Sequence, residues 1–371
     1  MRILSVFGTR PEAVKMAPVI LELGRTAGVD SHVCTTAQHR EMLDQVLQLF
    51  AIRPDVDLDL MREDQSLAEL GAAIFKELDP VFEQIQPDWV LLQGDTTTVA
   101  ITALLAYYRR IRIGHIEAGL RTHDKWQPFP EEVNRRVAGV SADLHFAPTE
   151  WARQNLLHEG VPARSITVTG NPVIDALQIV VGKPAPKEVL LLQKRLRLDP
   201  EGKRLILVTA HRRENFGAPL EGICTALKQL ARRGDVEIVY PVHLNPSVQG
   251  TVYRMLKDQP HVNLLPPMDY LPLIHLMKRA SLVLTDSGGI QEEAPAFGVP
   301  VLVLRQVTER PEGVEAGVLK LVGTEPGKIV LEASRLLDDP QAYAKMARAV
   351  SPFGDGKAAG RIVRTLLEFQ P

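Results

Sequence analysis

The stretch "RILSVFGTRPEAVKMAPVILELGR" (Arg2–Arg25) decides the fold class, because it joins a short apolar run to a longer helical pattern through a polar turn. The same alternation recurs downstream. The apolar runs "DSHVCTT", "DWVLLQGD", "IRIGHIEAG" and "DLHFAPT" alternate with helical patterns such as "HREMLDQVLQLF", "TTTVAITALLAYYRR" and "EWARQNLLHEG". Continuous apolar strands that alternate with helices are typical of parallel sheets covered on both faces.

The alternation restarts after "SITVTGNPVID", which indicates a second unit of the same class. Its apolar runs are "RLILVTAH", "VEIVYPVH", "HVNLLPP", "SLVLTDSGG" and "PVLVLRQ". A boundary near Gly170–Pro172 divides the chain into two α/β domains of similar size, which matches the usual domain length. The closing segment "KAAGRIVRTLLEFQ" is amphipathic and predicts a terminal helix.

The composition favours a globular protein and argues against several classes of partner. The chain has 371 residues, of which 45% are hydrophobic and 24% charged, with a formal net charge of −2. This balance favours neither nucleic acid nor an anionic membrane as a partner. No apolar run approaches a membrane span, and the first residues are too short for a signal peptide. Cys34 and Cys224 fit no metal spacing, so we expect buried reduced thiols and a cytoplasmic protein.

Polar side chains gather where the predicted strands end, in both halves of the chain. These ends read "FGTRPE", "QGDTTT", "IEAGLRT", "TAHRRENFG", "PVHLNP" and "TDSGGIQEE". Ligands of open α/β sheets bind at the carboxyl ends of strands. The sequence therefore predicts one ligand site in a cleft between the two domains.

The first of these ends carries two cations beside a helix start. Pro11 suits a first helical position, Arg10 stands just before it, and Lys15 lies about one turn inside. Two cations and a helix N-terminus suit a phosphate group. The alternative is a plain strand-to-helix turn with solvated charges. Neither the dinucleotide nor the P-loop glycine fingerprint is present.

Three carboxylates and one histidine are candidates for acid–base chemistry. Asp95 and Glu117 end successive strands, although Asp95 can also be read as a helix N-cap. Glu131 opens the helical run "PEEVNRR", where dipole complementarity and ion pairing explain the charges without any function. His211 ends a strand beside Arg212, which makes phosphate contact or proton transfer a reasonable role.

The segment "TDSGGIQEEAPAFG" predicts a nucleotide diphosphate site rather than a bare phosphate site. Ser287, Gly288 and Gly289 can offer backbone N–H groups to a diphosphate. Glu293 lies one helical turn further on and can accept hydrogen bonds from ribose hydroxyls. Glu292 points about 100° away and is interpreted as structural. The alternative, a glycine turn before an acidic first turn, does not explain Arg305 and Arg310 after the next strand.

Taken together, these motifs resemble the non-hydrolysing UDP-N-acetylglucosamine 2-epimerases. The matching runs occur in family order, namely "FGTRPEAVKMAPVI", "QGDTTT", "HIEAGLRT", "PEEVNRR", "GNPVID", "TAHRREN", "PVHLNP", "TDSGGIQEEAP", "TERPEG" and "SPFGDGKAAGRI". The resemblance implies two Rossmann-like domains of glycosyltransferase-B type with the active site in their cleft. It implies a homodimer, a UDP-sugar substrate, neither metal nor cofactor, and a role in polysaccharide biosynthesis. The returning C-terminal helix would give domains at residues 1–170 with 357–371, and at residues 171–356.

The resemblance also assigns roles residue by residue. It implies that the active-site residues are Arg10, Lys15, Asp95, Glu117, Glu131 and His211. The UDP-sugar contacts would be Ser287, Gly288, Gly289, Glu293 and Arg310.

The chain departs from the family pattern at a few positions. Around the uracil, Met268 replaces a glutamine and Leu273 replaces an aromatic residue, so stacking on the base would be lost. Activated members bind a second UDP-N-acetylglucosamine at a site that Gln38, His39, Arg212 and His243 match. There Glu41 replaces a glutamine and Asp64 replaces an arginine. A carboxylate in place of a phosphate-facing cation weakens anion binding, so we expect little or no activation.

The implied reaction inverts C2 of the sugar by eliminating UDP to a 2-acetamidoglucal and adding it back. The residues leave other activities open, namely a hydrolysing epimerase, an epimerase of a related UDP-diacetamido uronic acid, and a UDP-sugar-dependent glycosyltransferase. A catalytically silent UDP-sugar sensor would not need the acidic residues and the histidine, which are all present.

Overall fold

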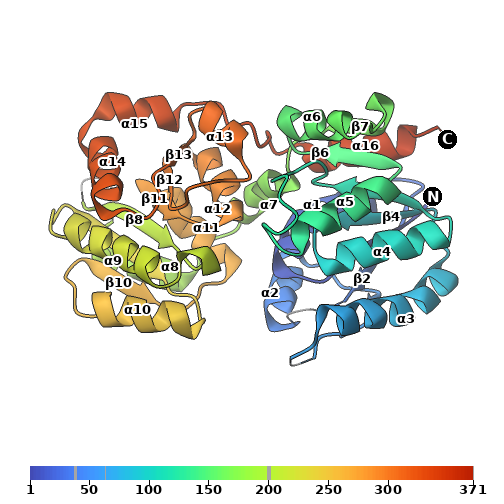
Figure 1. Cartoon of the computed structure of the whole chain (residues 1–371), viewed down its shortest axis with the longest axis horizontal. Helices are drawn as coiled ribbons and strands as arrows, with labels where there is room; N and C mark the ends of the chain where they lie inside the picture. Colours follow the sequence, from blue (N-terminus) through green and yellow to red (C-terminus); the bar gives the residue numbers. More distant parts are fainter. Residues whose placement is uncertain (37–39, 63, 199–201, 371) are drawn as a thin grey trace. The chain divides into compact units, whose positions relative to one another are not determined.

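A computed structural model describes residues 1–36, 40–62, 64–198 and 202–370, with side chains at 40–42 left undescribed. The chain divides into two compact units (Figure 1). Unit 1 comprises Met1–Gln178 and Phe353–Pro371, and unit 2 comprises Ile179–Pro352. No helix in the described ranges is both long enough and apolar enough to cross a membrane.

Unit 1 contains a parallel sheet with the strand order β3-β2-β1-β4-β5-β6-β7. The strands are β1 (Arg2–Phe7), β2 (Asp30–Thr35), β3 (Val56–Asp57), β4 (Trp89–Gln93), β5 (Arg112–Ile116), β6 (Leu144–Ala147) and β7 (Ile166–Val168). The helices are α1 (Arg10–Arg25), α2 (Arg40–Phe50), α3 (Leu67–Ile85), α4 (Thr97–Tyr108), α5 (Glu131–Ser141), α6 (Glu150–His158), α16 (Ala358–Glu368), and α7 (Pro172–Val181), which begins in this unit. The sequence patterns did not single out α3.

Unit 2 also contains a parallel sheet, with the strand order β10-β9-β8-β11-β12-β13. All the described strand pairs in it are parallel. The strands are β8 (Arg204–Thr209), β9 (Val236–Pro241), β10 (Val262–Leu265), β11 (Leu282–Thr285), β12 (Val301–Val303) and β13 (Leu319–Leu321). The helices are α8 (Lys187–Leu196), α9 (Ala218–Ala231), α10 (Pro246–Leu256), α11 (Tyr270–Arg279), α12 (Gly288–Glu293), α13 (Pro311–Glu315), α14 (Pro326–Asp338) and α15 (Pro340–Ala347).

The central strands of both sheets are buried along all or nearly all of their length, as continuous apolar runs require. In unit 1 the core is formed by β1, β4 and the facing sides of α3 and α4. In unit 2 it is formed by β8, β9, β11 and the helices α9 and α14. The predicted class, two α/β units with parallel sheets, is confirmed.

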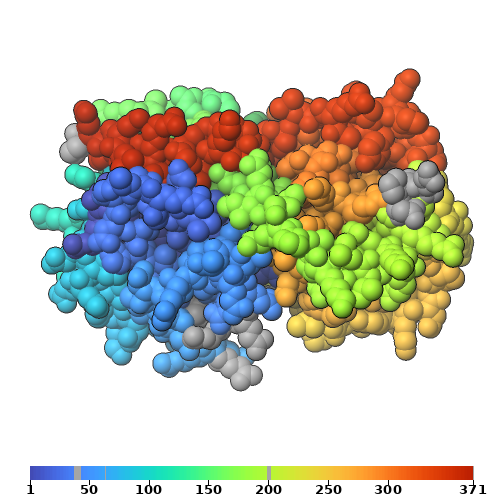
Figure 2. Space-filling view, turned by 180° about the vertical axis from the view of Figure 1, so that it is seen from behind, coloured from blue at the N-terminus to red at the C-terminus, as the bar shows by residue number. Residues whose placement is uncertain are grey.

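The division between the units differs from the expected one by a few residues at each crossing. Residues 171–178 and 353–356 belong to unit 1. The reason is that α7 is tied to the returning C-terminal segment. The Asp175 carboxylate accepts hydrogen bonds from the backbone N–H groups of Ala358 (3.1 Å) and Ala359 (2.9 Å). The helix that these amides begin, α16, lies against α1, where the red and blue segments meet in Figure 2.

Each sheet has one point where the strand order reverses direction. In unit 1 it lies between β1 and β4, and in unit 2 between β8 and β11. The loops that leave these strands separate at such a point and create a crevice at the carboxyl end of the sheet. The polar segments found in the sequence follow these strands, at residues 8–10, 94–96, 210–212 and 286–289.

Candidate functional site

The loops after β1 and β4 are joined by one buried carboxylate, that of Glu12. It accepts hydrogen bonds from the backbone N–H groups of Gly8 (3.1 Å) and Thr9 (2.7 Å) and from the hydroxyl of Thr96 (2.7 Å). Burial raises the pKa of Glu12, and these hydrogen bonds oppose the rise. The sequence analysis missed Glu12, although Thr9 and Glu12 have the T-x-x-E spacing of a capping box, and the structure contains that box.

The two cations of the first turn have different surroundings. Arg10 is half-buried at the start of α1. Lys15 is buried, and its ammonium forms an ion pair with the Glu117 carboxylate. For Lys15, the alternative of a solvated charge is therefore wrong. A buried lysine needs such a partner, because an isolated charge away from water is very costly.

Glu117 follows β5 in a backbone conformation that few residues adopt. Its φ is +65° and its side chain is buried. The same carboxylate oxygen that pairs with Lys15 accepts a hydrogen bond from the Asn171 side-chain amide at 2.8 Å. Non-glycine residues in the left-handed region cost on the order of 1–3 kcal/mol and gather at functional sites. Glu117 is thus held in place by a strained turn and by two donors.

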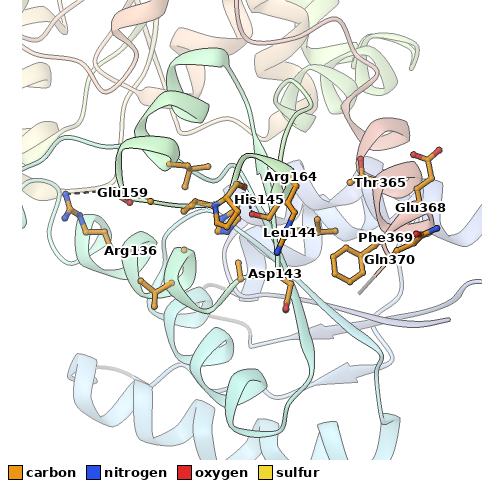
Figure 3. A pocket seen from close by; sticks show the side chains of 18 residues that line it. Arg136, Asp143, Leu144, His145, Glu159, Arg164, Thr365, Glu368, Phe369 and Gln370 are labelled. Carbon is orange, nitrogen blue, oxygen red and sulfur yellow. Dashed lines mark hydrogen bonds and ion pairs between the residues drawn. The ribbon is translucent and has the colours of Figure 1, made fainter.

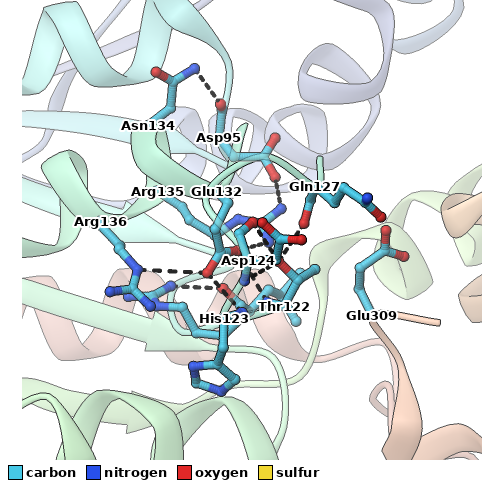
Figure 4. Close-up of polar contacts among 12 residues, drawn as sticks. Asp95, Thr122, His123, Asp124, Gln127, Glu132, Asn134, Arg135, Arg136 and Glu309 are labelled. Carbon is cyan, nitrogen blue, oxygen red and sulfur yellow. Dashed lines mark hydrogen bonds and ion pairs between the residues drawn. The ribbon is translucent and has the colours of Figure 1, made fainter. Parts of the chain in front are cut away.

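Asp95 follows β4, next to the strand that leads to Glu117, and α5 holds it (Figure 4). Its carboxylate forms an ion pair with Arg135, and its backbone oxygen accepts a hydrogen bond from the Asn134 side chain at 2.9 Å. Reading Asp95 as a helix N-cap is wrong, because Thr96 caps α4 by accepting from the Val99 amide. Asp95 therefore has no capping role in α4.

The charges of α5 contribute to the site rather than only to helix stability. Glu132 is fully buried and accepts hydrogen bonds from the backbone amides of Thr122 (3.1 Å) and His123 (3.2 Å). It also accepts from Arg135 at 3.0 Å, the same arginine that pairs with Asp95. Glu131 begins α5 and is half-buried. It lies one turn before Arg135, on the side of the helix that faces Asp95.

His115 stabilises the turn before Asp95 from the neighbouring strand. Its Nε2 lies 2.8 Å from the backbone oxygen of Gly94, so this nitrogen carries the proton. Burial lowers the pKa of His115 to about 4, and a neutral ring results at neutral pH. No motif in the sequence distinguishes His115 from a core histidine.

In unit 2, a buried aspartate organises the loop after β8. The Asp286 carboxylate accepts hydrogen bonds from the backbone amides of His211 (2.9 Å) and Arg212 (2.9 Å) and from the Asn215 side chain (2.9 Å). The His211 ring stacks on His243, with centroids 5.1 Å apart and planes 13° apart. Burial, His243 and Arg212 lower the pKa of His211 against the opposing charge of Asp286, so the neutral ring is favoured.

The segment after β11 forms a short helix, α12, whose first residues face Arg310. The Ser287 amide donates to the Thr285 hydroxyl at 3.0 Å, so this N–H is used within the loop. A Cβ on Gly288 would lie 2.8 Å from Arg310 Nη1, which explains the glycine by packing. A Cβ on Gly289 would meet nothing within 4 Å, so packing does not explain that glycine.

The two glutamates of α12 have different partners. The Glu293 carboxylate is buried and accepts a hydrogen bond from the Tyr270 hydroxyl at 2.9 Å. Glu292 accepts from Arg310 Nε at 2.7 Å, which agrees with its structural interpretation. Arg310 therefore stands between Glu292 and the backbone of Gly288.

A second ion-pair cluster surrounds Glu309. Its carboxylate accepts from Arg305 at 2.8 and 3.2 Å and from Arg310 at 3.3 Å. Burial alone would raise the pKa of Glu309, but Arg310 and Arg305 outweigh it and hold that pKa well below its ordinary value. Arg305 also donates to Glu214 at 2.5 Å. These ion pairs account for Arg305 without a ligand, which the sequence analysis did not foresee.

The remaining predicted positions are distributed as follows. Met268 and Leu273 are half-buried, and Met268 lines a pocket of about 500 Å³ together with Pro272 and residues of α8. Asp64 is exposed, with φ +55°. Gln38, His39 and the side chain of Glu41 lie outside the described residues.

A larger cavity lies away from these residues, at the amino end of β6 (Figure 3). Its volume is about 1130 Å³, and its lining includes Arg136, His145, Arg164 and Phe369. None of the predicted site residues lines it. Across the part of the chain that the structure describes, no group of three or more His, Cys, Asp or Glu side chains could hold a metal ion.

Comparisons with known proteins agree with the motifs and with the two-unit fold. The family model described as UDP-N-acetylglucosamine 2-epimerase matches residues 21–367. The chain is 53% identical to the UDP-N-acetylglucosamine 2-epimerase of Yersinia pestis over 374 residues, covering 100% of this chain and 99% of the relative. It is 51% identical to the Escherichia coli K12 enzyme over 370 residues, covering 99% and 98%.

Two solved structures extend the comparison to the fold. The UDP-GlcNAc 2-epimerase of Neisseria meningitidis, crystallised with UDP-GlcNAc, has a TM-score of 0.94 and 47% identity over the full length of both chains. The Methanocaldococcus jannaschii enzyme, crystallised with UDP-GlcNAc and UDP, has a TM-score of 0.85 and 32% identity, again over both full chains. The predicted glycosyltransferase-B-type fold is confirmed. The chain belongs to the UDP-N-acetylglucosamine 2-epimerase family.

Proposed function

We propose that the chain interconverts UDP-N-acetylglucosamine and UDP-N-acetylmannosamine without hydrolysing either sugar nucleotide. The observation that carries this proposal is Glu117, a buried carboxylate that a strained turn and two donors fix at the carboxyl end of β5. Asp95 follows the adjacent strand, so both carboxylates lie at the carboxyl edge of the unit 1 sheet, after the strand at the switch point and after its neighbour. Such an arrangement suits proton transfer at a carbon atom.

The chemistry explains why carboxylates and a diphosphate site are both needed. No carbonyl group adjoins C2 of the sugar, so direct removal of its proton would be very slow. If the C1–O bond to UDP breaks while C2–H loses its proton, a C1=C2 double bond forms and UDP leaves as the anion. Adding UDP back to C1 while C2 takes a proton on the other face completes the inversion. Each direction needs an acid–base group and stabilisation of the diphosphate.

We assign the two tasks to the two units. Asp95, Glu117 and Glu131 of unit 1 handle the proton, since transfer on two faces needs at least two groups or one that moves.

In unit 2, the residues that hold the departing diphosphate are His211, Gly288, Gly289 and Arg310, and Arg10 of unit 1 assists. Glu293 accepts hydrogen bonds from the ribose hydroxyls. The UDP-GlcNAc and UDP bound in the related crystal structures support a substrate of this class.

The test is to incubate the protein with UDP-N-acetylglucosamine in D₂O and to follow the mixture by NMR. We expect UDP-N-acetylmannosamine to appear, with deuterium at C2 of both sugars. Accumulation of UDP and free N-acetylmannosamine would show a hydrolysing enzyme and refute the proposal. An unchanged spectrum would refute it too, in favour of another UDP-sugar or of a transferase that lacks its acceptor.

Glu117→Gln tests the assignment of the proton-transfer group. We expect turnover to fall by about 10²–10⁴-fold, the usual value of a positioned acid–base group, while the affinity for UDP changes little. Glu150→Gln is the matched control, because Glu150 is an exposed glutamate of the same unit. Turnover of Glu117→Gln close to that of the control would remove Glu117 from the mechanism.

We further propose that UDP-N-acetylglucosamine activates this enzyme weakly or not at all. The support is Asp64, an exposed carboxylate where the resemblance expects an arginine. Initial rates should depend hyperbolically on the concentration of UDP-N-acetylglucosamine. Asp64→Arg should strengthen anion binding, because it replaces a carboxylate with a cation. Sigmoidal rates that Asp64→Ala abolishes would contradict this proposal. The resemblance also supports a homodimer, which analytical ultracentrifugation can test.

A further inference from the structure

Asn171, the residue before α7, is held from three sides although no role has been assigned to it. Its side chain is buried, and its Oδ1 accepts a hydrogen bond from the Val173 amide at 3.2 Å. Its own backbone N–H donates to the Phe353 oxygen at 2.7 Å. Because Oδ1 is the acceptor for Val173, the side-chain NH₂ group must point the other way.

That NH₂ group donates to Glu117 Oε2 at 2.8 Å. The same oxygen forms the ion pair with Lys15, so one donor from α1 and one from the residue before α7 meet on one oxygen of this carboxylate. Hydrogen bonds and a cation at a carboxylate favour its charged form. The two donors also fix the orientation of the carboxylate. The strained turn fixes the backbone of Glu117 at the other end of the same side chain.

Further charges near Glu117 come from its own strand, from the loop after it and from α5. His115, two residues earlier in β5, is close enough to experience the Glu117 charge. Arg121 and Arg135 act on the same imidazole. Lys15 contacts the carboxylate directly as a cation, and Asn171 is a neutral donor beside it.

We propose that Asn171 is a positioning residue of the epimerisation, which together with Lys15 keeps Glu117 ionised and aimed at C2 of the sugar. This inference rests on the proposed function. It goes further by assigning a role to a residue that does not touch the substrate. The alternative is that Asn171 only caps α7 through Val173.

Asn171→Asp separates the two roles. An aspartate keeps an acceptor for the Val173 amide, so the start of α7 retains its cap. It replaces the donor to Glu117 with a second carboxylate, and a like charge at this distance makes Glu117 give up its proton less readily. Because the proposal requires Glu117 in its ionised form, the acid limb of the pH profile of kcat/KM should move to higher pH by about one unit. Movement of the alkaline limb instead would show that Glu117 acts in its protonated form and would overturn the proposal.

The chain offers a closely matched control in unit 2. Asn263 donates to the buried Glu237 at 2.9 Å, and Lys203 pairs with the same carboxylate at 2.7 Å. Asn263→Asp makes the same chemical change to an asparagine–glutamate–lysine group whose residues lie on β10, on β9 and just before β8, away from the residues of the proposed site. We expect this variant to lose stability to a similar degree and to keep the wild-type pH profile.

The experiment measures kcat/KM from pH 5 to pH 9 for the wild type and both variants, with circular dichroism to check folding. A shift of the acid limb in Asn171→Asp alone supports the proposal. No shift, or the same shift in Asn263→Asp, overturns it. If Asn171→Asp does not fold, Asn171→Ala carries the test with a smaller shift in the same direction. Deuterium incorporation by the wild type decides the proposed function separately, so the two failures can be told apart.

Discussion

Acid should weaken unit 1 through two buried histidines on neighbouring strands. His115 of β5 and His145 of β6 lie opposite each other in the sheet, and both are almost fully buried. Burial lowers the pKa of each ring to about 4 from its ordinary value of 6.5. The unfolded chain therefore binds more protons, so the stability present above pH 6.5 is lost as the pH falls toward 4.

The size of the loss follows from these two pKa values. Between pH 8 and pH 5, each histidine should remove about 2 kcal/mol from the free energy of unfolding. His145→Gln removes one titrating ring, so the variant should lose about 2 kcal/mol less than the wild type over this range. Other groups titrate equally in both proteins and cancel in the comparison.

The assay is urea unfolding at pH 8 and pH 5, followed by tryptophan fluorescence. All three tryptophans, Trp89, Trp126 and Trp151, belong to unit 1, so the signal reports the unit that holds both histidines. His158→Gln is the control, because its ring is exposed on α6 of the same unit. An equal loss of stability in the wild type and in His145→Gln would refute the reasoning.

Two further predictions concern packing. Gly288→Ala should destabilise unit 2 by about 1–3 kcal/mol and weaken UDP binding measured by calorimetry, because the added methyl would push Arg310 away. Gly250→Ala on α10 should do neither, since nothing lies within 4 Å of the added carbon; equal effects of the two changes would contradict the argument. Cys34 and Cys224 should react with a thiol reagent only in denaturant, because burial raises the pKa of each thiol to about 12. Rapid labelling of the native protein would disprove their burial.

The sequence by itself determined the class of fold and the segments that carry polar groups. Apolar runs alternate with helical patterns. This periodicity is a local property of the sequence and does not depend on which strands pair. It was sufficient to predict parallel sheets in two units. It was also sufficient to find the turns after β1, β4, β5, β8 and β11, where the candidate residues lie.

The tertiary structure alone decided which of these residues contact each other. Lys15 and Glu117 are 102 positions apart, and their pairing depends on how β1, β4 and β5 align in the sheet. Asn171 reaches Glu117 from the start of α7, and no spacing rule connects the two. Likewise, only the structure shows that Thr96, and not Asp95, caps α4 by accepting a hydrogen bond from the Val99 amide. Local patterns predict where chemistry can occur, whereas the partner of each side chain depends on strand order and on competition among neighbouring donors.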